Sequence, residues 1–296
     1  MEYKFIEYCE RKCIDRVVNF EDCNLGVKSA EVLSGILKYN QNISHLNLSK
    51  NSLKDEGVNI LMNAVKNTSN IVSIQLASND LTHISGDIIF EILFEQNSII
   101  SLDLSSNEGT NRNRLTADGV KKLSKLLKTN NYLEFLKLGG NSLKNEGLRY
   151  ILRGLDNNST MNLLDLSNNE INSFGISYFE DCLKTSKLID LDLSYNQISD
   201  QGLEKLSKCI NQPSLNSLKK LNLANCNMKA EGIVTFFSAL QHNKKLENLN
   251  LNKNNFSGEN FEAIKNNFYL INIKELRMSG CRLGNNGGKF YYNYFS

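Results

Sequence analysis

Three aspartates and one lysine occupy matching places in short leucine-rich segments, and a fourth aspartate lies two residues before one of them, where their charges could bind a partner. They occur with two apolar residues in Leu-x-Leu segments, and the set is Asp103, Phe135, Lys137, Leu163, Asp165, Asp190 and Asp192. An acidic surface with an apolar centre suits a basic, partly hydrophobic protein segment. The alternative is a solvated polar face. Neighbouring carboxylates repel each other, so they need water or a cationic partner to screen them.

The cysteines and histidines form no catalytic or metal-binding pattern. Seven Cys is an odd number without framework spacing, which is typical of a reducing compartment. Cys9 and Cys13 lie one helical turn apart, but no further Cys or His has the spacing of a structural zinc site. His45 lies in a predicted strand, yet no motif supplies the third group that a Ser–His or Cys–His nucleophile needs. The sequence predicts no metal, no cofactor and no enzymatic activity.

A glycine-rich segment at residues 284–290 has some features of a phosphate-binding loop. Leu283 stands where the first Gly of such a loop belongs, and Phe290 follows Lys289 where Ser or Thr is required. We therefore expect no nucleotide or other small-molecule substrate.

Composition excludes several further classes of partner. The chain has 34 Lys and Arg against 32 Asp and Glu, a net charge of +2. This balance gives no long-range attraction to nucleic acid or to an anionic membrane. No apolar signal region follows the charged start, and no uncharged apolar stretch is long enough to span a bilayer. We expect a cytoplasmic protein, with the cytoskeleton as one candidate location.

The charged residues are positioned by an internal repeat. Segments such as Leu46-Asn47-Leu48 and Leu191-Asp192-Leu193 recur every 27 to 30 residues, apart from one interval of 34. Each ends on a polar "ladder" position three residues after its second apolar residue. The predicted ladder reads Cys23, Asn51, Asn79, Asn107, Asn141, Asn169, Asn196, Cys226, Asn254 and Cys281.

A second pattern follows each segment. Apolar residues four apart recur in register, as in Leu61/Val65 and Leu206/Ile210. Period two predicts a strand and period four a helix, so each repeat is a strand, a loop and a helix. A single copy cannot bury its own apolar face, but ten stacked copies bury a continuous core.

This pattern resembles the ribonuclease-inhibitor-like leucine-rich repeats, over roughly residues 14–296. The resemblance implies an α/β solenoid, a right-handed horseshoe of about ten repeats with a parallel sheet on its concave face. The ladder Asn is expected to hydrogen-bond backbone groups of the turn that leaves the strand. Residues 1–13 are predicted to form an N-terminal capping helix, and the last helix has no polar cap.

The longest repeat carries about six extra residues between Asn107 and Leu115. They include Arg112 and Arg114 and predict a basic loop on the rim of the solenoid. Inserted loops on rigid scaffolds often carry function. A partner-contact loop and a tolerated surface insertion both fit this pattern.

The leading functional hypothesis is a non-enzymatic protein–protein interaction scaffold, a component of a larger cytoskeletal or signalling assembly. It would bind a partner of unknown identity, expected to be basic, through the concave face and the rim loops. The alternative is a GTPase-activating protein resembling the activator of Ran, which often carries an acidic tail that this chain does not show. Lysines on the helices, such as Lys121 and Lys125, are either a solvated face or a docking surface for an acidic polymer.

Overall fold

The computed structural model describes residue 13, residues 15–106, 109, 111–257, 264, 266–267 and 271–283. It divides into two compact units, Met1–Leu143 and Lys144–Ser296, called here the N-terminal and C-terminal units. The predicted capping helix over residues 1–13 lies outside the described residues except for Cys13, and so does the predicted last helix.

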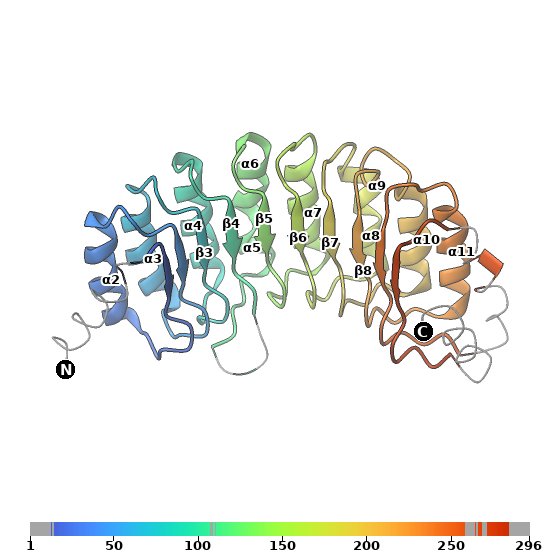
Figure 1. The fold of residues 1–296 in the computed structure, drawn as a ribbon, viewed down its shortest axis with the longest axis horizontal. Coiled ribbons are helices and arrows are strands. Elements are labelled where there is room, and N and C mark those ends of the chain that lie inside the picture. The colour runs from blue at the N-terminus through green and yellow to red at the C-terminus, as the bar shows by residue number, and fades with distance from the viewer. Residues whose placement is uncertain are drawn as a thin grey trace. The chain divides into compact units, whose positions relative to one another are not determined.

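Strand and helix alternate in the N-terminal unit (Figure 1). Its strands are β1 (Val17–Asn19), β2 (His45–Asn47), β3 (Ser73–Gln75), β4 (Ser101–Asp103) and β5 (Phe135–Lys137). Its helices are α2 (Val27–Tyr39), α3 (Lys54–Val65), α4 (His83–Glu95), α5 (Thr116–Gly119) and α6 (Lys121–Thr129). The strands pair in parallel and in chain order.

The C-terminal unit has the same alternation. Its strands are β6 (Leu163–Asp165), β7 (Asp190–Asp192), β8 (Lys220–Asn222), β9 (Asn248–Asn250) and β10 (Glu275–Arg277). Its helices are α7 (Lys144–Leu155), α8 (Ser173–Ile176), α9 (Tyr178–Cys182), α10 (Ser199–Cys209) and α11 (Ala230–Leu240). These strands are also parallel and in chain order. The predicted leucine-rich repeat solenoid is confirmed.

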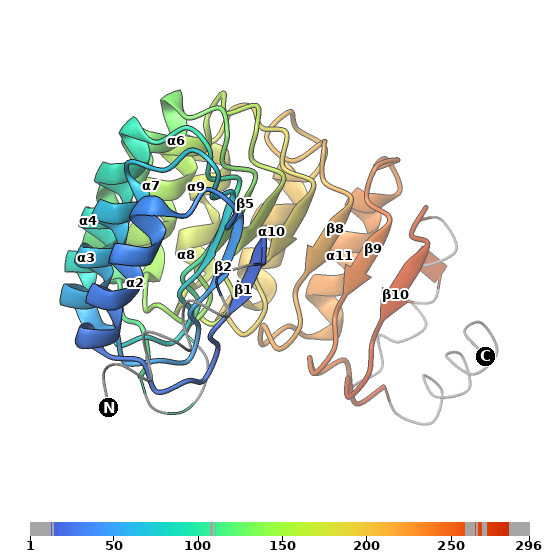
Figure 2. The same cartoon turned by 60° about the vertical axis from the view of Figure 1, so that its left-hand side comes forward.

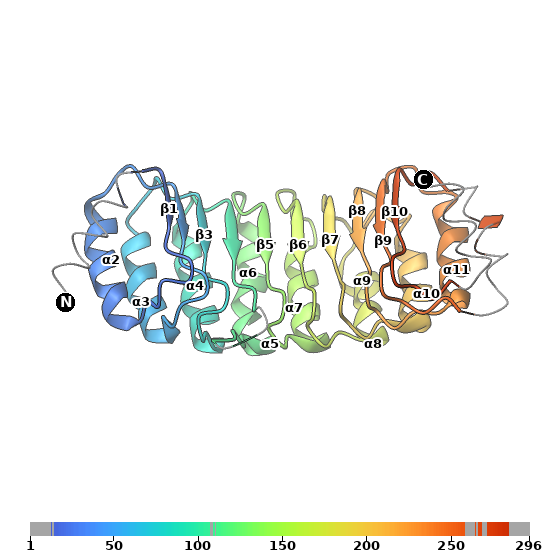
Figure 3. The same cartoon turned by 60° about the horizontal axis from the view of Figure 1, so that its bottom comes forward.

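In each unit the helices cover one side of the sheet. Figure 2 shows α2, α3 and α4 stacked on the same side of the first strands, and Figure 3 shows α10 and α11 together on one side of β8 and β9. The middle residue of each strand and the buried apolar residues of the helices meet between these layers. Leu46, Leu136, Leu191 and Leu221 are at most 2% exposed. The first and third residues of each strand lie on the opposite side, called here the open sheet face.

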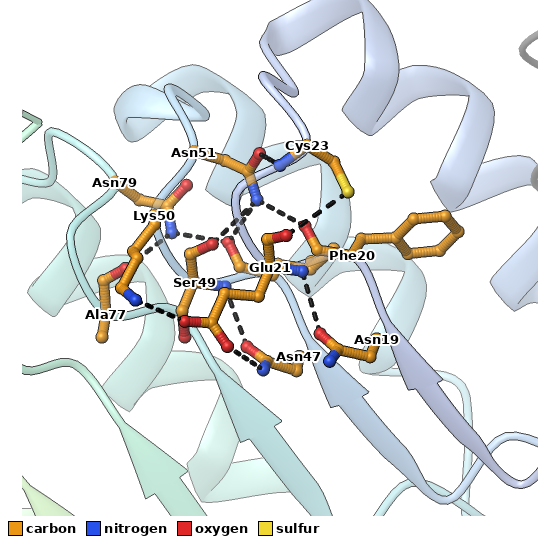
Figure 4. Close-up of polar contacts among 11 residues, drawn as sticks. Asn19, Phe20, Glu21, Cys23, Asn47, Ser49, Lys50, Asn51, Ala77 and Asn79 are labelled. Carbon is orange, nitrogen blue, oxygen red and sulfur yellow. Dashed lines mark hydrogen bonds and ion pairs between the residues drawn. The ribbon is translucent and has the colours of Figure 1, made fainter.

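Buried side-chain amides join consecutive repeats. Asn51 donates to the carbonyls of Phe20 and Leu48, both at 2.9 Å, and to that of Ser49 at 3.0 Å. Its Oδ1 accepts from the backbone N–H groups of Cys23 (3.1 Å) and Leu25 (2.8 Å). Figure 4 shows Asn51 in contact with the first repeat and its own turn. One side chain thus satisfies backbone groups of two turns that are shielded from water.

In the repeat that carries the insertion, the ladder position differs from the predicted one. Asn113 is the buried ladder residue of this repeat, and the predicted Asn107 lies outside the described residues. The Asn113 amide donates to the carbonyls of Leu76 (3.1 Å) and Leu104 (3.0 Å). Its Oδ1 accepts from the N–H of Asn79 (2.8 Å) and of Leu81 (3.1 Å). The motif Leu-x-Leu-x-x-Asn points to Asn107 by spacing, but the extra residues precede the ladder position rather than follow it.

Cysteine replaces the ladder amide in two buried positions. The thiol of Cys226 contacts the carbonyl of Leu193 at 3.3 Å, and that of Cys281 contacts the carbonyl of Leu251 at 3.0 Å. Burial raises the pKa of Cys226 to about 12, so its thiol stays protonated and unreactive at neutral pH. These cysteines are explained by the repeat and not by chemistry.

The residue before the ladder position adopts left-handed backbone in nearly every repeat. Lys50 has φ 56°, Asn168 51° and Tyr195 58°, while Gly140 has 75° and Gly280 71°. At Gly140 a Cβ would also overlap the carbonyl oxygen of Ser106. At Gly280 the nearest atom to a Cβ would be 3.7 Å away.

We expect Asn196→Ala to lower the free energy of unfolding by about 3 kcal/mol, because the backbone N–H groups of Asn169 and Ile171 would lose their buried acceptor. Asn196→Cys should cost less, since Cys226 serves at the equivalent position. Urea unfolding of each variant measures this, with exposed Asn131→Ala as control. A midpoint for Asn196→Ala equal to that of the control would contradict the ladder role.

We expect Gly140→Ala to destabilise the fold by at least about 1 kcal/mol more than Gly280→Ala. Both substitutions place an L-residue in the left-handed region, but only at Gly140 must the backbone shift to admit the methyl group. Thermal unfolding of the two variants side by side tests the difference. Equal losses would show that the close approach to Ser106 is unimportant.

Candidate functional site

The side chain of the third residue of most strands closes the turn that ends the strand. The Oδ1 atoms of Asp103, Asp165 and Asp192 each accept the backbone N–H two residues on, at 2.9, 2.9 and 2.8 Å. Asparagines do the same at this position in other repeats, namely Asn19, Asn47, Asn222 and Asn250. This side-chain turn ends the strand. It requires Asp or Asn, but it does not require a negative charge.

Three of the predicted aspartates come together on the open sheet face of the C-terminal unit. Asp165 and Asp192 are direct partners in the parallel register, and Leu163 is the partner of Asp190. All four side chains are partly exposed. The sheet thus carries a block of carboxylates beside one leucine, as the sequence predicts.

Neighbouring amides and cations contact two carboxylates of this block. Asn222 donates to Oδ2 of Asp192 at 2.7 Å, and Lys220 Nζ lies 3.9 Å from Oδ2 of Asp190. Desolvation and the charge of Asp192 raise the pKa of Asp190, while the Lys220 charge opposes the shift. The ionised form of Asp190 is therefore disfavoured in the folded chain, and a bound cation would stabilise it.

A shallow hollow of about 290 Å³ extends this face toward the end of the unit. Asp190, Asp192 and Lys220 line one part of it, and Glu275 and Arg277 line another. The guanidinium of Arg277 forms an ion pair with Glu275 at 2.6 Å. Charges of both signs meet here, so the acidic character is strongest over β6 and β7.

The open sheet face of the N-terminal unit is more apolar. Phe135 is 39% exposed, and its backbone N–H bonds to the carbonyl of Ile100 at 3.0 Å. Ile100 and Tyr132 are 36% and 45% exposed. Lys137 Nζ lies 3.9 Å from Oδ2 of Asp103, so that pair balances its own charge. Sequence reasoning missed Ile100 and Tyr132, because both precede their strands and fall outside the alternating pattern.

The arginines of the rim loop are exposed and close to the ladder. Arg112 and Arg114 flank the buried Asn113, and the backbone N–H of Arg114 bonds to the carbonyl of Leu81 at 2.7 Å. Neither guanidinium has an ion-pair partner among the residues that the structure describes. The ladder anchors this stretch, while its two side chains point into solvent.

Metal and nucleophile chemistry find no support in the described part of the chain. No group of three or more His, Cys, Asp or Glu there could hold a metal ion. Ser44 Oγ lies 2.9 Å from Nδ1 of His45, but among the described residues no carboxylate orients this ring. No helix in the described ranges has the length and apolar character needed to cross a membrane.

Comparison with solved structures finds similar chains of known fold. The structure titled "Leiomodin-1 Actin-Binding Site 2 (ABS2)" is 18% identical, covers 45% of this chain and 76% of its own, and has a TM-score of 0.37. The "Crystal structure of Rad7 and Elc1 complex in yeast" is 14% identical, covers 90% and 77%, and has a TM-score of 0.45. No curated protein matches the sequence.

Family profiles match the repeats directly. A profile described as "Leucine Rich repeat" matches residues 39–59, 129–152, 157–179, 186–207, 214–237 and 269–290. A second, "Leucine Rich Repeat", matches residues 245–267. Together these matches span just over half of the 296 residues, and they coincide with the strand and helix repeats of both units. The chain therefore belongs to the leucine-rich repeat family.

Proposed function

We propose that this chain is a non-enzymatic protein–protein interaction scaffold whose open sheet face binds a basic, partly apolar segment of a partner. Leucine-rich repeat proteins generally mediate such interactions, and their repeats present extended binding surfaces. The repeat length of 27 to 30 residues supports the ribonuclease-inhibitor-like subclass. We place the protein in the cytoplasm, as a component of a cytoskeletal or signalling assembly.

One observation carries the proposal: adjacent aspartates occupy a position where asparagine would close the same strand-ending turn. Asp165 and Asp192 each close a side-chain turn that Asn222 and Asn250 close elsewhere without charge. Placing carboxylates on neighbouring strands about 4.8 Å apart introduces repulsion. The strand-ending turn does not need this charge, whereas a cationic partner would be attracted by it.

The N-terminal unit supplies the apolar and rim elements of the proposal. Phe135, Ile100 and Tyr132 are exposed apolar side chains of this unit, of the kind that can anchor a partner. Arg112 and Arg114 flank the anchored ladder residue Asn113 and would contact an acidic group of a partner. These contacts suit a protein surface of mixed character better than a uniform polyelectrolyte.

Replacing the three turn aspartates should weaken capture of a basic ligand while preserving the strand-ending turns. In the combined variant Asp103→Asn, Asp165→Asn, Asp192→Asn, every strand-ending turn keeps its acceptor oxygen. We expect affinity for a Lys- and Arg-rich peptide with one central Phe to fall roughly tenfold, from several partly exposed charge pairs. Fluorescence anisotropy measures the affinity, and urea unfolding checks stability.

The matched control removes three exposed helix carboxylates by Glu31→Gln, Glu56→Gln and Asp181→Asn. It changes net charge equally, so it should alter peptide affinity less than twofold. Equal loss in both variants would refute a localised acidic site. Accelerated GTP hydrolysis by small GTPases mixed with the chain would instead favour the GTPase-activator alternative.

Asp190 should make stability depend on pH in a predictable direction. Its folded-state pKa is raised, so between the unfolded and folded values the native chain holds the proton more tightly. Its contribution therefore declines as pH rises through that window. We expect Asp190→Asn to be more stable than wild type at pH 7, by under about 1 kcal/mol because solvent screens the group. The gap should vanish below the unfolded pKa of about 4.

Urea midpoints of both proteins across this range give the difference, in which titrations common to both cancel. A gap that stays constant with pH would show that folding does not shift the pKa of Asp190. A gap of the opposite sign would show that the attraction of Lys220 dominates the environment of Asp190.

A further inference from the structure

A second hollow in the C-terminal unit lies at the amino-terminal ends of its strands. It encloses about 590 Å³, and its lining includes three lysines. Lys187 lies three residues before β7, Lys219 directly before β8, and Lys245 three residues before β9. Since these strands are adjacent and parallel, the lysines form a row across three consecutive repeats.

These lysines differ from several cations that lie on or beside the strands of the described residues. Lys220, Lys137 and Lys274 each lie within 4.0 Å of a carboxylate. Lys187, Lys219 and Lys245 have no ion pair among the described residues, and no Asp or Glu lines the hollow. All three are exposed. The lining of the hollow therefore carries a positive charge, and none of its three lysines is ion-paired with a described carboxylate.

Glu247 is the acidic residue nearest to Lys245 in the sequence, and its carboxylate already forms an ion pair with Lys274. Hydrogen bonding to Lys274, at 3.0 Å, is the main cause that lowers the pKa of Glu247, and the Lys219 charge adds to it. Glu247 thus offsets part of the Lys219 charge from a distance, but it forms no ion pair with Lys219.

The floor of the hollow is held in place by backbone hydrogen bonds. The carbonyl of Ile189 accepts from the N–H groups of Lys219 (2.8 Å) and Lys220 (3.0 Å). Ser217 Oγ bonds to the carbonyl of Ser186 at 3.2 Å, which orders the loop before β8. Ile189 and Pro213 add apolar surface among these polar groups. A rigid base with long cationic side chains suits an extended ligand.

We propose that this hollow binds an acidic segment of a partner protein, through Lys187, Lys219 and Lys245. Charge complementarity indicates that the ligand is negatively charged. The hollow extends across three strands, about 4.8 Å apart, and part of its lining is apolar, which favours an extended peptide over a single small anion. Lysines contact carboxylates as flexible point charges, which a row of Asp and Glu can satisfy. This surface is separate in charge and location from the acidic open sheet face and does not depend on it.

The test uses the full chain and a fluorescein-labelled peptide of about ten residues, rich in Asp and Glu with one central Leu, which is long enough to span the row. The variant is Lys187→Gln, Lys219→Gln, Lys245→Gln. Its matched control is Lys121→Gln, Lys125→Gln, Lys128→Gln on the exposed side of α6, with the same loss of charge. Anisotropy titrations at physiological ionic strength give the affinities.

We expect the hollow variant to lose roughly tenfold or more in affinity and the control less than twofold. The same peptide with Gln and Asn in place of its acids should not bind. Equal loss in both variants would overturn the proposal by showing only general attraction. Full competition by millimolar inorganic phosphate would also overturn it, in favour of a small-anion site. Because this assay uses an acidic peptide and lysine variants, its failure leaves the basic-peptide result on the open sheet face unaffected.

Discussion

The fold depends on one recurring interaction, the buried side chain that hydrogen-bonds the turn after each strand. Such a turn bends sharply and leaves N–H and carbonyl groups that neither sheet nor helix can satisfy. An Asn amide has two donors and an acceptor on a short arm, so Asn51 can satisfy the turn of its own repeat and that of the repeat before it. Unpaired, these buried groups would each cost about 1–3 kcal/mol.

That constraint explains which substitutions the repeats accept. Cys226 and Cys281 keep a weakly polar atom at the ladder and are buried as fully as the amides they replace. Asn113 shows the same constraint under insertion, because the extra residues are accommodated ahead of the ladder and the amide contacts are kept. The turn geometry is conserved within the chain while the length of the preceding loop varies.

Because the ladder side chains satisfy the buried backbone groups, the exposed positions of the repeats can carry charge. The open sheet face of the C-terminal unit holds Asp165, Asp190 and Asp192, and the strand-entry edge of the same unit holds Lys187, Lys219 and Lys245. A chain with a net charge of only +2 thus separates its charges into surfaces of opposite sign. Such separation gives specificity for partners through attraction on one surface and repulsion on the other.

Much of this protein is readable from its sequence, because the period of Leu-x-Leu and the spacing of the helix residues are set by local geometry. The parallel strands, the buried helix positions and the placing of Asp165 beside Asp192 follow from that register. Three features needed the tertiary structure. Spacing alone pointed to Asn107 and could not show that Asn113 reaches the carbonyls of Leu76 and Leu104. The alternating pattern could not include Ile100 or Tyr132, whose exposure depends on the path of the chain before each strand. The lysine row joins residues from three repeats at unequal offsets, so only the stacking of those repeats brings them to one hollow.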